Sequence, residues 1–227
     1  QTGISTAPRP SPGGLAVSCN PCFIQIGARL GKERFCDYFA AFGLREATGI
    51  DLPGEVRRSE YYTADRMGPV ELASCSFGQS SKVSYLQMLT AVCAVVNGGE
   101  LMQPYVVAKI TAPDGTVVKE VQPTVKRRVI SAETSATMCR LMEGVVTGGT
   151  GKQAALAGYR IGGKTGTAQT GQFSGGTELK NYWFAGFVPA EQPRYTIVVL
   201  QDTQAEPAFS SAAIFARVAA GLEILVP

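Results

Sequence analysis

The feature that most constrains the fold is a change of pattern at the glycine-rich run Gly148-Gly149-Thr150-Gly151. Before this run, apolar residues recur mainly at helical spacing, and capping residues and glycines mark where helices begin and end. After it, the chain turns to short apolar segments typical of β-strands, followed by one last helical pattern. Helices first, then a strand, a hairpin and a helix predict an α+β fold, with an antiparallel sheet flanked by helices.

The N-terminal third begins with a segment that has no helical or strand pattern. Residues 1–14 are rich in Pro, Gly, Ser and Thr, so we expect an extended linker there. Asn20 before Pro21 predicts a helix start, with Asn20 as the N-cap and Pro21 at the first helical position. Gly31 and Gly43 predict the ends of two successive helices.

The middle of the chain combines turns, two capped helices and a hairpin. Between residues 44 and 83 the composition predicts mostly turns. The capping box Ser84-Tyr85-Leu86-Gln87 opens a helix, and Ser131 caps a later one. Between them, the apolar residues of Tyr105 to Val121 predict a hairpin that turns at Pro113-Asp114-Gly115.

The C-terminal part predicts three strands and a helix. A β-compatible segment runs from Gly162 to Gln169, and apolar strands run from Tyr182 to Val188 and from Tyr195 to Leu200 as an antiparallel hairpin. Ser210 or Ser211 then caps a helix. We expect its inward face to carry Ile214, Val218, Leu222 and Leu225.

The chain contains no histidine, which excludes several kinds of catalytic and metal site. A Ser-His-Asp triad, a Cys-His dyad and a His-ligated metal centre are all ruled out. Acid–base chemistry near neutral pH must therefore use Lys, a carboxylate, Tyr, Cys or Ser. With 227 residues and only 17% charged residues, against about 25% in ordinary soluble domains, the composition indicates a compact body.

Charge and hydropathy argue against nucleic acid and against a membrane span. The net charge is +3, and the densest basic run is only Lys126-Arg127-Arg128, so no clustered basic face for nucleic acid is expected. No segment approaches the ~18 consecutive apolar residues of a membrane helix. We expect any membrane anchor to lie outside these residues.

Six cysteines, at positions 19, 22, 36, 75, 93 and 139, raise the question of metal or redox sites. Cys19 and Cys22 have metal-like spacing, but a structural zinc site needs a second pair or histidines. Simple packing is the favoured interpretation, with a disulfide or a metal as less favoured alternatives. We expect neither a metal nor another cofactor.

Two motifs compete for Lys164. Residues Gly158 to Thr165 fit the phosphate-loop pattern G-x-x-x-x-G-K-[ST]. That loop needs a preceding strand and a helix that starts at its Lys-Thr pair, so that backbone N–H groups hold the phosphate. The glycines and threonines that follow Thr165 do not favour a helix, which argues against this interpretation.

The second motif is Lys164-Thr165-Gly166-Thr167, placed on a strand. Alternation sends Lys164 and Gly166 to one face and both threonines to the other, although strand twist or a bulge near Gly166 would bring them around one cleft. A cation beside hydroxyl groups suits a carboxylate ligand. Gly166 leaves room for a substrate to lie along the strand as an added β-strand.

These motifs give the chain a family resemblance. Lys164-Thr165-Gly166 together with Ser18-Cys19-Asn20 resembles two of the three active-site signatures of the penicillin-binding proteins, K-T-G and S-x-N, and is most similar to class B members of division or sporulation type. The resemblance implies a β-lactamase/transpeptidase-like fold. Supporting stretches are Thr48 to Glu55, Phe77-Gly78-Gln79, Leu86-Gln87, Asn97-Gly98-Gly99 and Trp183 to Pro189.

The chain departs from the family in one respect. The third signature, S-x-x-K, holds the nucleophilic serine and its lysine base, and it occurs nowhere in this sequence. We therefore expect an incomplete domain: residues 1–14 as a linker or artificial junction, and residues 15–227 as the C-terminal portion of a transpeptidase domain. Such a portion is expected to be inactive alone.

The resemblance implies a role for each matching residue. Ser18 would relay a proton to the departing D-Ala amine, and Asn20 would hydrogen-bond the missing lysine and the substrate's peptide carbonyl. Lys164 would supply positive potential for the substrate carboxylate, which Thr165 and Thr167 would bind beside Gly166. Lys164 would also tune Ser18, so the two side chains are expected to face one cleft within hydrogen-bond or one-water reach. The backbone N–H of Thr167 would form half of an oxyanion hole.

The resemblance also implies partners and a location. These are peptidoglycan stem peptides ending in D-Ala-D-Ala, β-lactams, the missing N-terminal part of the same domain, and the extracytoplasmic face of the bacterial cell membrane. Two alternatives stay open. The chain can be a non-catalytic binding module of the same fold, or Ser18 and Asn20 can simply start a helix, because capping is the usual role of Asn before Pro.

Overall fold

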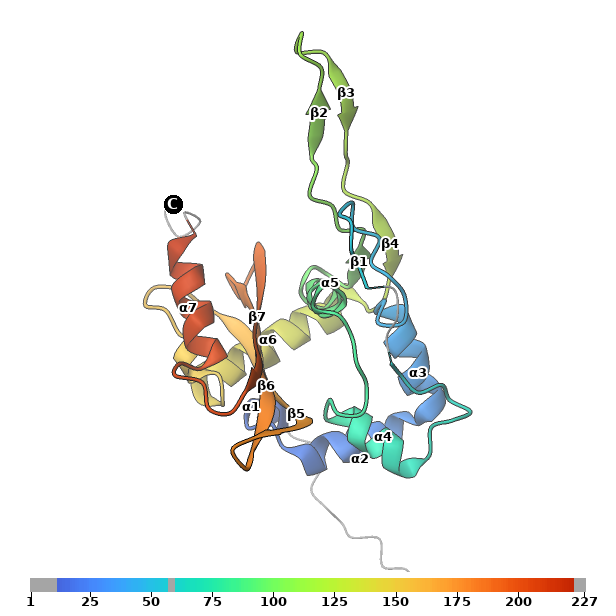
Figure 1. Cartoon of the computed structure of the whole chain (residues 1–227), viewed down its shortest axis with the longest axis vertical. Helices are drawn as coiled ribbons and strands as arrows, with labels where there is room; N and C mark the ends of the chain where they lie inside the picture. The colour runs from blue at the N-terminus through green and yellow to red at the C-terminus, as the bar shows by residue number, and fades with distance from the viewer. Residues whose placement is uncertain (1–11, 57–59, 223–227) are drawn as a thin grey trace, which may run out of the picture.

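The computed structural model describes residues 12–56 and 60–222, and one antiparallel sheet organises the C-terminal part (Figure 1). Its strands, β5 (Gly162–Ser174), β6 (Thr177–Val188) and β7 (Tyr195–Gln204), lie in chain order. The predicted strand and antiparallel hairpin are confirmed, and all three strands run further than predicted. The mixture of helices and antiparallel sheet confirms the α+β assignment.

Two phenylalanines of β6 anchor the cores on the two faces of this sheet. Phe184 and Phe187 are both 0% exposed and, three positions apart, they project to opposite faces. Phe184 packs edge-on against Phe215 of α7 (Ser211–Gly221), with ring centroids 5.0 Å apart. Phe187 packs with Val96, the last residue of α5 (Tyr85–Val96), and Met142 of α6 (Ala132–Gly148). Helices therefore cover both faces.

Glycines at the start of β5 let this strand lie against the two rings. A Cβ on Gly162 would stand 2.2 Å from the ring of Phe187, and a Cβ on Gly163 would stand 2.4 Å from the ring of Phe184. Because both rings are fully buried, they have little room to move aside. The Gly-Gly pair is thus a packing requirement immediately before the Lys164-Thr165 segment.

The inward face of α7 differs from the prediction. Ser210 is the cap, since its side chain accepts a hydrogen bond from the N–H of Ala213. The buried positions, however, are Ser211, Ala212, Phe215, Ala216 and Ala219. Of the four residues predicted to face inward, Val218 is exposed, Ile214 and Leu222 are half-buried, and Leu225 lies outside the described residues. Small alanines bring the helix close to the sheet, so that Phe215 fills the space above Gly186.

The N-terminal helices begin earlier than the prediction placed them. Residues 12–14, predicted as linker, open the short helix α1 (Pro12–Ala16), whereas residues 1–11 lie outside the described part. Asn20 is already the first residue of α2 (Asn20–Leu30), and Cys19, not Asn20, takes the N-cap position. The chain reverses at Ser18, whose φ is +56°. After this tight turn, α2 begins at Asn20, one residue earlier than the predicted first helical position, Pro21.

The two predicted helix ends are found. Gly31 closes α2 with a φ of 80°, and α3 (Lys32–Ala41) ends just before Gly43, which has a φ of 78°. The expectation of mostly turns between 44 and 83 was wrong in one place. Helix α4 (Pro69–Ser76) forms there, because Pro69 starts it and the Glu71 carboxylate accepts the N–H of Gly68 at 3.0 Å. Its buried Cys75 packs with Cys36 of α3.

The two predicted serine caps of the middle region are confirmed. Ser84 accepts the N–H of Gln87 at 3.1 Å while Gln87 Oε1 accepts the N–H of Ser84 at 2.7 Å, so the capping box opens α5. Ser131 accepts the N–H of Thr134 at 3.1 Å at the start of α6. The short strands β1 (Glu100–Met102) and β4 (Val125–Arg128) pair between these helices, and the 3₁₀ turn η1 (Lys152–Ala154) follows α6.

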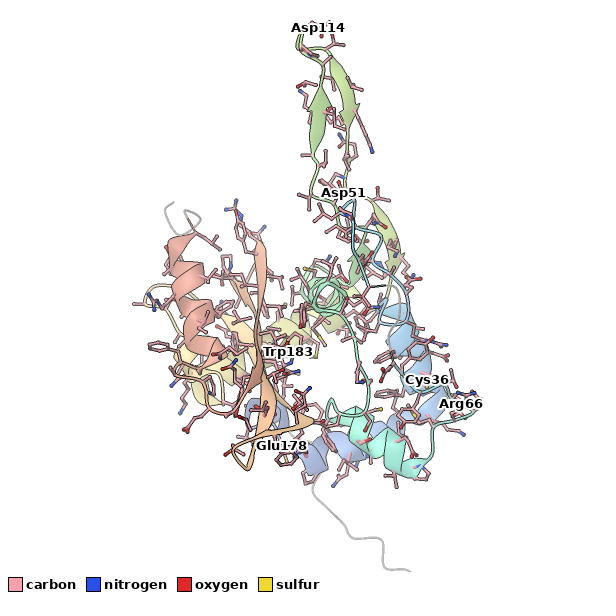
Figure 2. All side chains as sticks on the ribbon, viewed as in Figure 1. Cys36, Asp51, Arg66, Asp114, Glu178 and Trp183 are labelled. Atoms are coloured by element: carbon pink, nitrogen blue, oxygen red, sulfur yellow. The ribbon has the colours of Figure 1, made fainter. Side chains whose placement is uncertain are left out.

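The predicted hairpin forms an arm that projects from the body (Figure 1). Strands β2 (Lys109–Thr111) and β3 (Val117–Glu120) pair antiparallel and are exposed along their whole length. Asp114 lies at the tip of the arm and Asp51 at its base (Figure 2). The carboxylate of Asp51 accepts the N–H groups of Val106 and Val107 at 2.7 and 2.9 Å, which fixes the point where the arm leaves the body.

The loop that carries Asp51 is itself held by side chains. Glu55 accepts the N–H groups of Thr48 and Gly49 at 2.6 and 3.0 Å, and Gln103 donates to the carbonyl oxygens of the same two residues. The hydrogen bonds of Val107 and Val106 hold the pKa of the Asp51 carboxyl below its usual value. The stretch Thr48 to Glu55 therefore serves as a polar clamp for the base of the arm.

The packing of β5 gives a stability test with a matched control. Gly163→Ala is expected to lower the free energy of unfolding by about 1–3 kcal/mol, because its Cβ overlaps the buried ring of Phe184. Gly166→Ala on the same strand places its Cβ 3.4 Å from Trp183 Cβ, an ordinary contact, and is expected to cost less than about 1 kcal/mol. Urea unfolding followed by circular dichroism measures both. Equal losses in the two variants would contradict the packing argument.

Candidate active site

Lys164 lies at the centre of the candidate site, on β5. Its ammonium nitrogen donates to Ser18 Oγ at 2.9 Å and to the carbonyl oxygen of Thr165 at 2.8 Å, and it lies 3.4 Å from Thr165 Oγ1. The ion pairs found in the described part of the chain do not include Lys164. Burial lowers the pKa of the Lys164 ammonium. The site thus contains a half-buried cation whose hydrogen-bond partners are all uncharged.

A tight turn between α1 and α2 presents Ser18 to this cation. The N–H groups of Ser18 and Cys19 return to the carbonyl oxygens of Leu15 and Gly14 at 3.2 and 2.9 Å. Ser18 has a φ of +56°, a left-handed conformation that costs a non-glycine residue about 1–2 kcal/mol. The expected contact between Ser18 and Lys164, which are 146 positions apart, is therefore present within direct hydrogen-bond reach.

The Lys-Thr-Gly-Thr segment lies on a regular part of β5. Residues 164–167 pair in unbroken register with 185 to 182 of β6, and the only register irregularity of this pair falls between Gln169 and Phe173. The bulge considered near Gly166 is therefore absent. The ammonium nevertheless lies within reach of the Thr165 hydroxyl, at 3.4 Å, and donates to the Thr165 carbonyl oxygen at 2.8 Å. Since these residues lie in a strand, a phosphate loop that opens a helix does not form here.

The structure brings together some of the predicted site residues but not all. Ser18, Lys164 and Thr165 form one hydrogen-bonded cluster. Asn20 is exposed at the start of α2, and Thr167 is exposed two positions beyond Thr165, on the same face of the strand. Among the described residues, no hydrogen bond joins the side chain of Asn20 or Thr167 to this cluster.

Thr150 also belongs to the cluster, although no motif in the sequence indicates it. Its hydroxyl lies 2.7 Å from that of Thr165, and its N–H donates to the carbonyl oxygen of Ala16 at 2.9 Å. The only signal in the sequence was the glycine-rich run around it, which marks a turn and not a functional side chain. The contact depends on how the end of α6 meets β5, which the sequence does not show.

The edge position of β5 adds a second binding element. Within the described residues, the sheet order places β5 at one edge, next to β6 only. An edge strand leaves alternate N–H and C=O groups free, so an extended peptide can pair with it. An ammonium, nearby hydroxyls and an open strand edge together suit a peptide that ends in a carboxylate.

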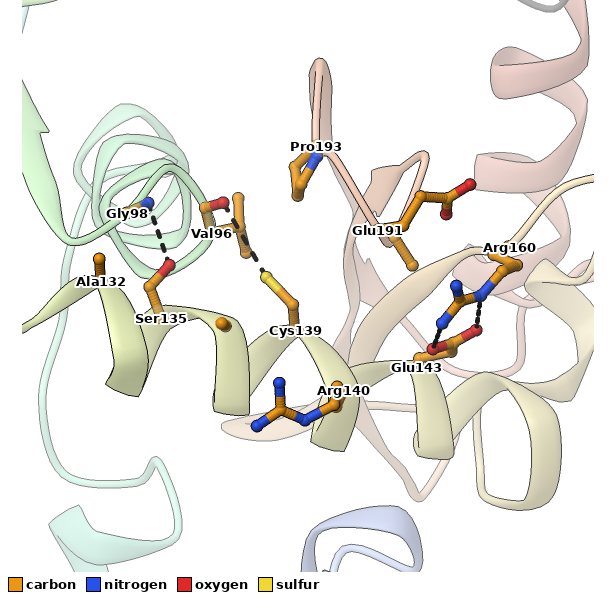
Figure 3. Close-up of a pocket in the computed structure, with 12 residues that line it drawn as sticks. Val96, Gly98, Ala132, Ser135, Cys139, Arg140, Glu143, Arg160, Glu191 and Pro193 are labelled. Carbon is orange, nitrogen blue, oxygen red and sulfur yellow. Dashed lines mark hydrogen bonds and ion pairs between the residues drawn. The ribbon is translucent and has the colours of Figure 1, made fainter.

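A separate cavity lies elsewhere in the described part of the molecule. A cavity of about 360 Å³ is formed between α6 and the turn after β6, and its lining includes Cys139, Arg160 and Pro193 but not Ser18 or Lys164 (Figure 3). The guanidinium of Arg160 there makes a bidentate pair with Glu143, both bonds at 2.7 Å. We place the candidate site at the Lys164 cluster, because chemistry depends on the groups present and not on cavity size.

In the described part of the chain, no group of three or more His, Cys, Asp or Glu side chains is arranged to hold a metal ion. No described helix is long and apolar enough to cross a membrane. The six cysteines are free, and Cys36, Cys75 and Cys139 are buried, as expected for cysteines used in packing.

Comparison with known proteins gives consistent matches. The family model for the penicillin binding protein transpeptidase domain matches residues 11–220. The chain is 43% identical over 189 residues to Stage V sporulation protein D of Bacillus subtilis, covering 82% of this chain and 29% of that protein. It is also 31% identical over 217 residues to the peptidoglycan D,D-transpeptidase FtsI of Escherichia coli, covering 92% of this chain and 35% of that protein.

Solved structures agree with the sequence matches. The crystal structure of penicillin binding protein 3 from Mycobacterium tuberculosis, complexed with aztreonam, superposes with a TM-score of 0.84 at 32% identity. The match covers 92% of this chain and 50% of that one. The chain therefore spans half or less of the length of these relatives.

The contact between Ser18 and Lys164 can be tested by NMR titration of lysine side chains. The hydroxyl oxygen of Ser18 accepts from the ammonium and so favours its charged form. Ser18→Ala is expected to lower the pKa of Lys164 further below its usual value, in the direction that burial already moves it. Ser174→Ala, at the far end of the same strand, is the control and should leave that pKa unchanged. An unchanged or raised pKa in Ser18→Ala would show that the contact is not formed in solution.

Proposed function

This chain belongs to the penicillin-binding protein transpeptidase domain family, with relatives of the class B type, and from that membership we propose that it carries the substrate-binding and proton-relay side of a D,D-transpeptidase active site. The proposed substrates are peptidoglycan stem peptides that end in D-Ala-D-Ala, and β-lactams are the proposed inhibitors. The proposal places the domain on the extracytoplasmic face of the cell membrane, where peptidoglycan is cross-linked.

The observation that carries the proposal is the hydrogen bond of 2.9 Å between Lys164 Nζ and Ser18 Oγ. It joins the two family motifs present in the sequence, although they lie on different elements and far apart in the chain. A purely structural role for Ser18 would not require its hydroxyl to meet the one half-buried ammonium of the K-T-G strand. The left-handed backbone at Ser18 supports a functional role, since strain of this kind gathers at functional sites.

Substrate binding would use the cation and the hydroxyls of β5. The terminal carboxylate of the stem peptide would accept from Lys164 and from the hydroxyls of Thr165 and Thr167, while the peptide backbone pairs with the open edge of β5 beside Gly166. The half-buried position of Lys164 strengthens its attraction for a carboxylate, because water screens it less. It also explains why the positive charge is left unpaired among the described residues.

Proton transfer would pass through Ser18. When the bond between the two D-Ala residues breaks, the departing nitrogen needs a proton, and the hydroxyl of Ser18 would supply it and be re-protonated through its hydrogen-bond partners. The backbone N–H of Thr167 would form one half of an oxyanion hole, and Asn20 would orient the substrate's peptide carbonyl. The acylating serine and its lysine base, which belong to S-x-x-K, are absent from this sequence.

Binding of a stem-peptide analogue tests the substrate-binding proposal. N-acetylated L-Lys-D-Ala-D-Ala is expected to shift the NMR signals of Lys164, Thr165 and Thr167, with a Kd on the order of 1 mM, because an exposed half-site gains little from charge pairing. The C-terminal amide of the same peptide should bind about two- to fivefold more weakly, since it lacks the charge that Lys164 attracts and an exposed charge pair contributes about 0–1 kcal/mol.

Two lysine variants separate specific from general attraction. Lys164→Met should reduce the shifts of Thr165 and Thr167, whereas Lys109→Met, which removes an equivalent charge from the exposed arm, should leave them intact. Equal binding of the acid and the amide, or equal loss in the two variants, would reject a carboxylate site at Lys164. If the folded chain binds neither peptide, the result would favour the alternative function, a non-catalytic module of the same fold.

Reactivity towards penicillin tests the assignment of the nucleophile. No serine of this chain has a lysine three positions later, so none has the base that activates the family's nucleophile. We expect intact-protein mass spectrometry after incubation with benzylpenicillin to show no covalent adduct, because loss of such a unit lowers rates by orders of magnitude. A stoichiometric mass increase that maps to any serine of these 227 residues would show that the nucleophile has been misplaced.

A further inference from the structure

Thr150 contacts both segments that build the Lys164 cluster. It lies two positions beyond the end of α6, and its hydroxyl is 2.7 Å from that of Thr165 on β5. Its backbone N–H donates to the carbonyl oxygen of Ala16, the last residue of α1, at 2.9 Å. Ser18 follows Ala16 by two residues. One residue therefore touches both the strand that carries the cation and the turn that carries the serine.

The backbone around Thr150 packs closely against the end of α1. A Cβ on the preceding residue, Gly149, would stand 2.1 Å from the carbonyl oxygen of Ala16 and 2.9 Å from that of Val145. Only glycine allows this approach of backbone to backbone. The main chain at Thr150 is thus fixed by packing, although its side chain is exposed.

Hydrogen-bond counting at Thr165 assigns a role to this hydroxyl. A hydroxyl has one proton and two acceptor sites. Thr165 Oγ1 has Lys164 Nζ at 3.4 Å as one donor and Thr150 Oγ1 at 2.7 Å as its other neighbour. If Thr150 donates, both acceptor sites of Thr165 are occupied, and the proton of Thr165 is left to point outward to a ligand.

We propose that Thr150 is a positioning residue for the carboxylate site, whose hydroxyl sets the rotamer of Thr165 and directs the Thr165 proton to the ligand. This inference rests on the proposed function only for the identity of the ligand. The orientation of Thr165 is a property of the chain itself and can be measured with no ligand present.

The first test measures that orientation directly. Three-bond couplings of the Thr165 side chain report its χ1 rotamer. Thr150→Val keeps the shape of the side chain and removes the hydroxyl, and it should change Thr165 from one rotamer to an average of several. Thr150→Ser keeps the hydroxyl and should retain the single rotamer. An unchanged rotamer in Thr150→Val overturns the proposal, whether or not any peptide binds.

The second test measures binding of N-acetylated L-Lys-D-Ala-D-Ala. Thr150→Val should weaken binding about three- to fivefold, the effect of one modest hydrogen bond, and Thr150→Ser should restore it. In a Thr165→Val background, Thr150→Val should have no further effect, because it acts through Thr165. Additive losses, or equal losses in the Ser and Val variants, would mean that Thr150 acts through packing alone and would overturn the proposal.

The two tests separate the two proposals. If the wild-type chain binds neither peptide, the proposed function fails, while the rotamer measurement still decides the role of Thr150. If the wild type binds and Thr150→Val changes neither rotamer nor affinity, the positioning role fails and the proposed function stands. Thermal unfolding of each variant confirms that it is folded at the temperature of measurement.

Discussion

The close approach of β5 to β6 over two buried phenylalanine rings is the constraint on which the candidate site depends. Phe184 and Phe187 occupy the space on both faces of the sheet where Cβ atoms of Gly163 and Gly162 would otherwise lie. A strand packed in this way has almost no freedom to shift in register or height. Because the next residue is Lys164, the packing of the core directly sets the position of the cation.

From that fixed strand, the site is assembled by polar contacts between segments that are distant in sequence. Lys164 reaches Ser18 on the turn between α1 and α2, and Thr165 meets Thr150 beyond α6. The ammonium is half-buried and has only uncharged partners among the described residues, so no carboxylate of that part of the chain balances its charge. The proposed function, which rests on family membership, makes a peptide carboxylate the proposed anion.

Polar side chains that bind main-chain groups also explain the stretch Thr48 to Glu55, which supports the family resemblance but has no role in the motifs. In the loop from Thr48 to Glu55, the carboxylate of Glu55 holds the loop's own N–H groups, and the carboxylate of Asp51 holds those of Val106 and Val107. Among the described residues, no hydrogen bond or ion pair joins this loop to the Lys164 cluster. Their role is to set the base of the arm, so a stretch shared with a family need not belong to its active site.

The sequence by itself determined the kinds of element and much of the site. The capping box at Ser84, the cap at Ser131 and the helix ends at Gly31 and Gly43 are local signals, which the chemistry of a few neighbouring residues produces. The three strands follow from their apolar pattern, although their full lengths depend on pairing in the sheet. The pairing of Ser18 with Lys164 was also predicted, although only through the family resemblance.

Only the tertiary structure decided the rest. The inward face of α7 follows from the room that Gly186 leaves for Phe215, and the helix start at Asn20 follows from the reversal at Ser18. Thr150 is part of the site because the segment after α6 contacts both α1, at Ala16, and β5, at Thr165. Each of these depends on the distance between segments that are not neighbours in the chain, and a pattern of residue types carries no such distance.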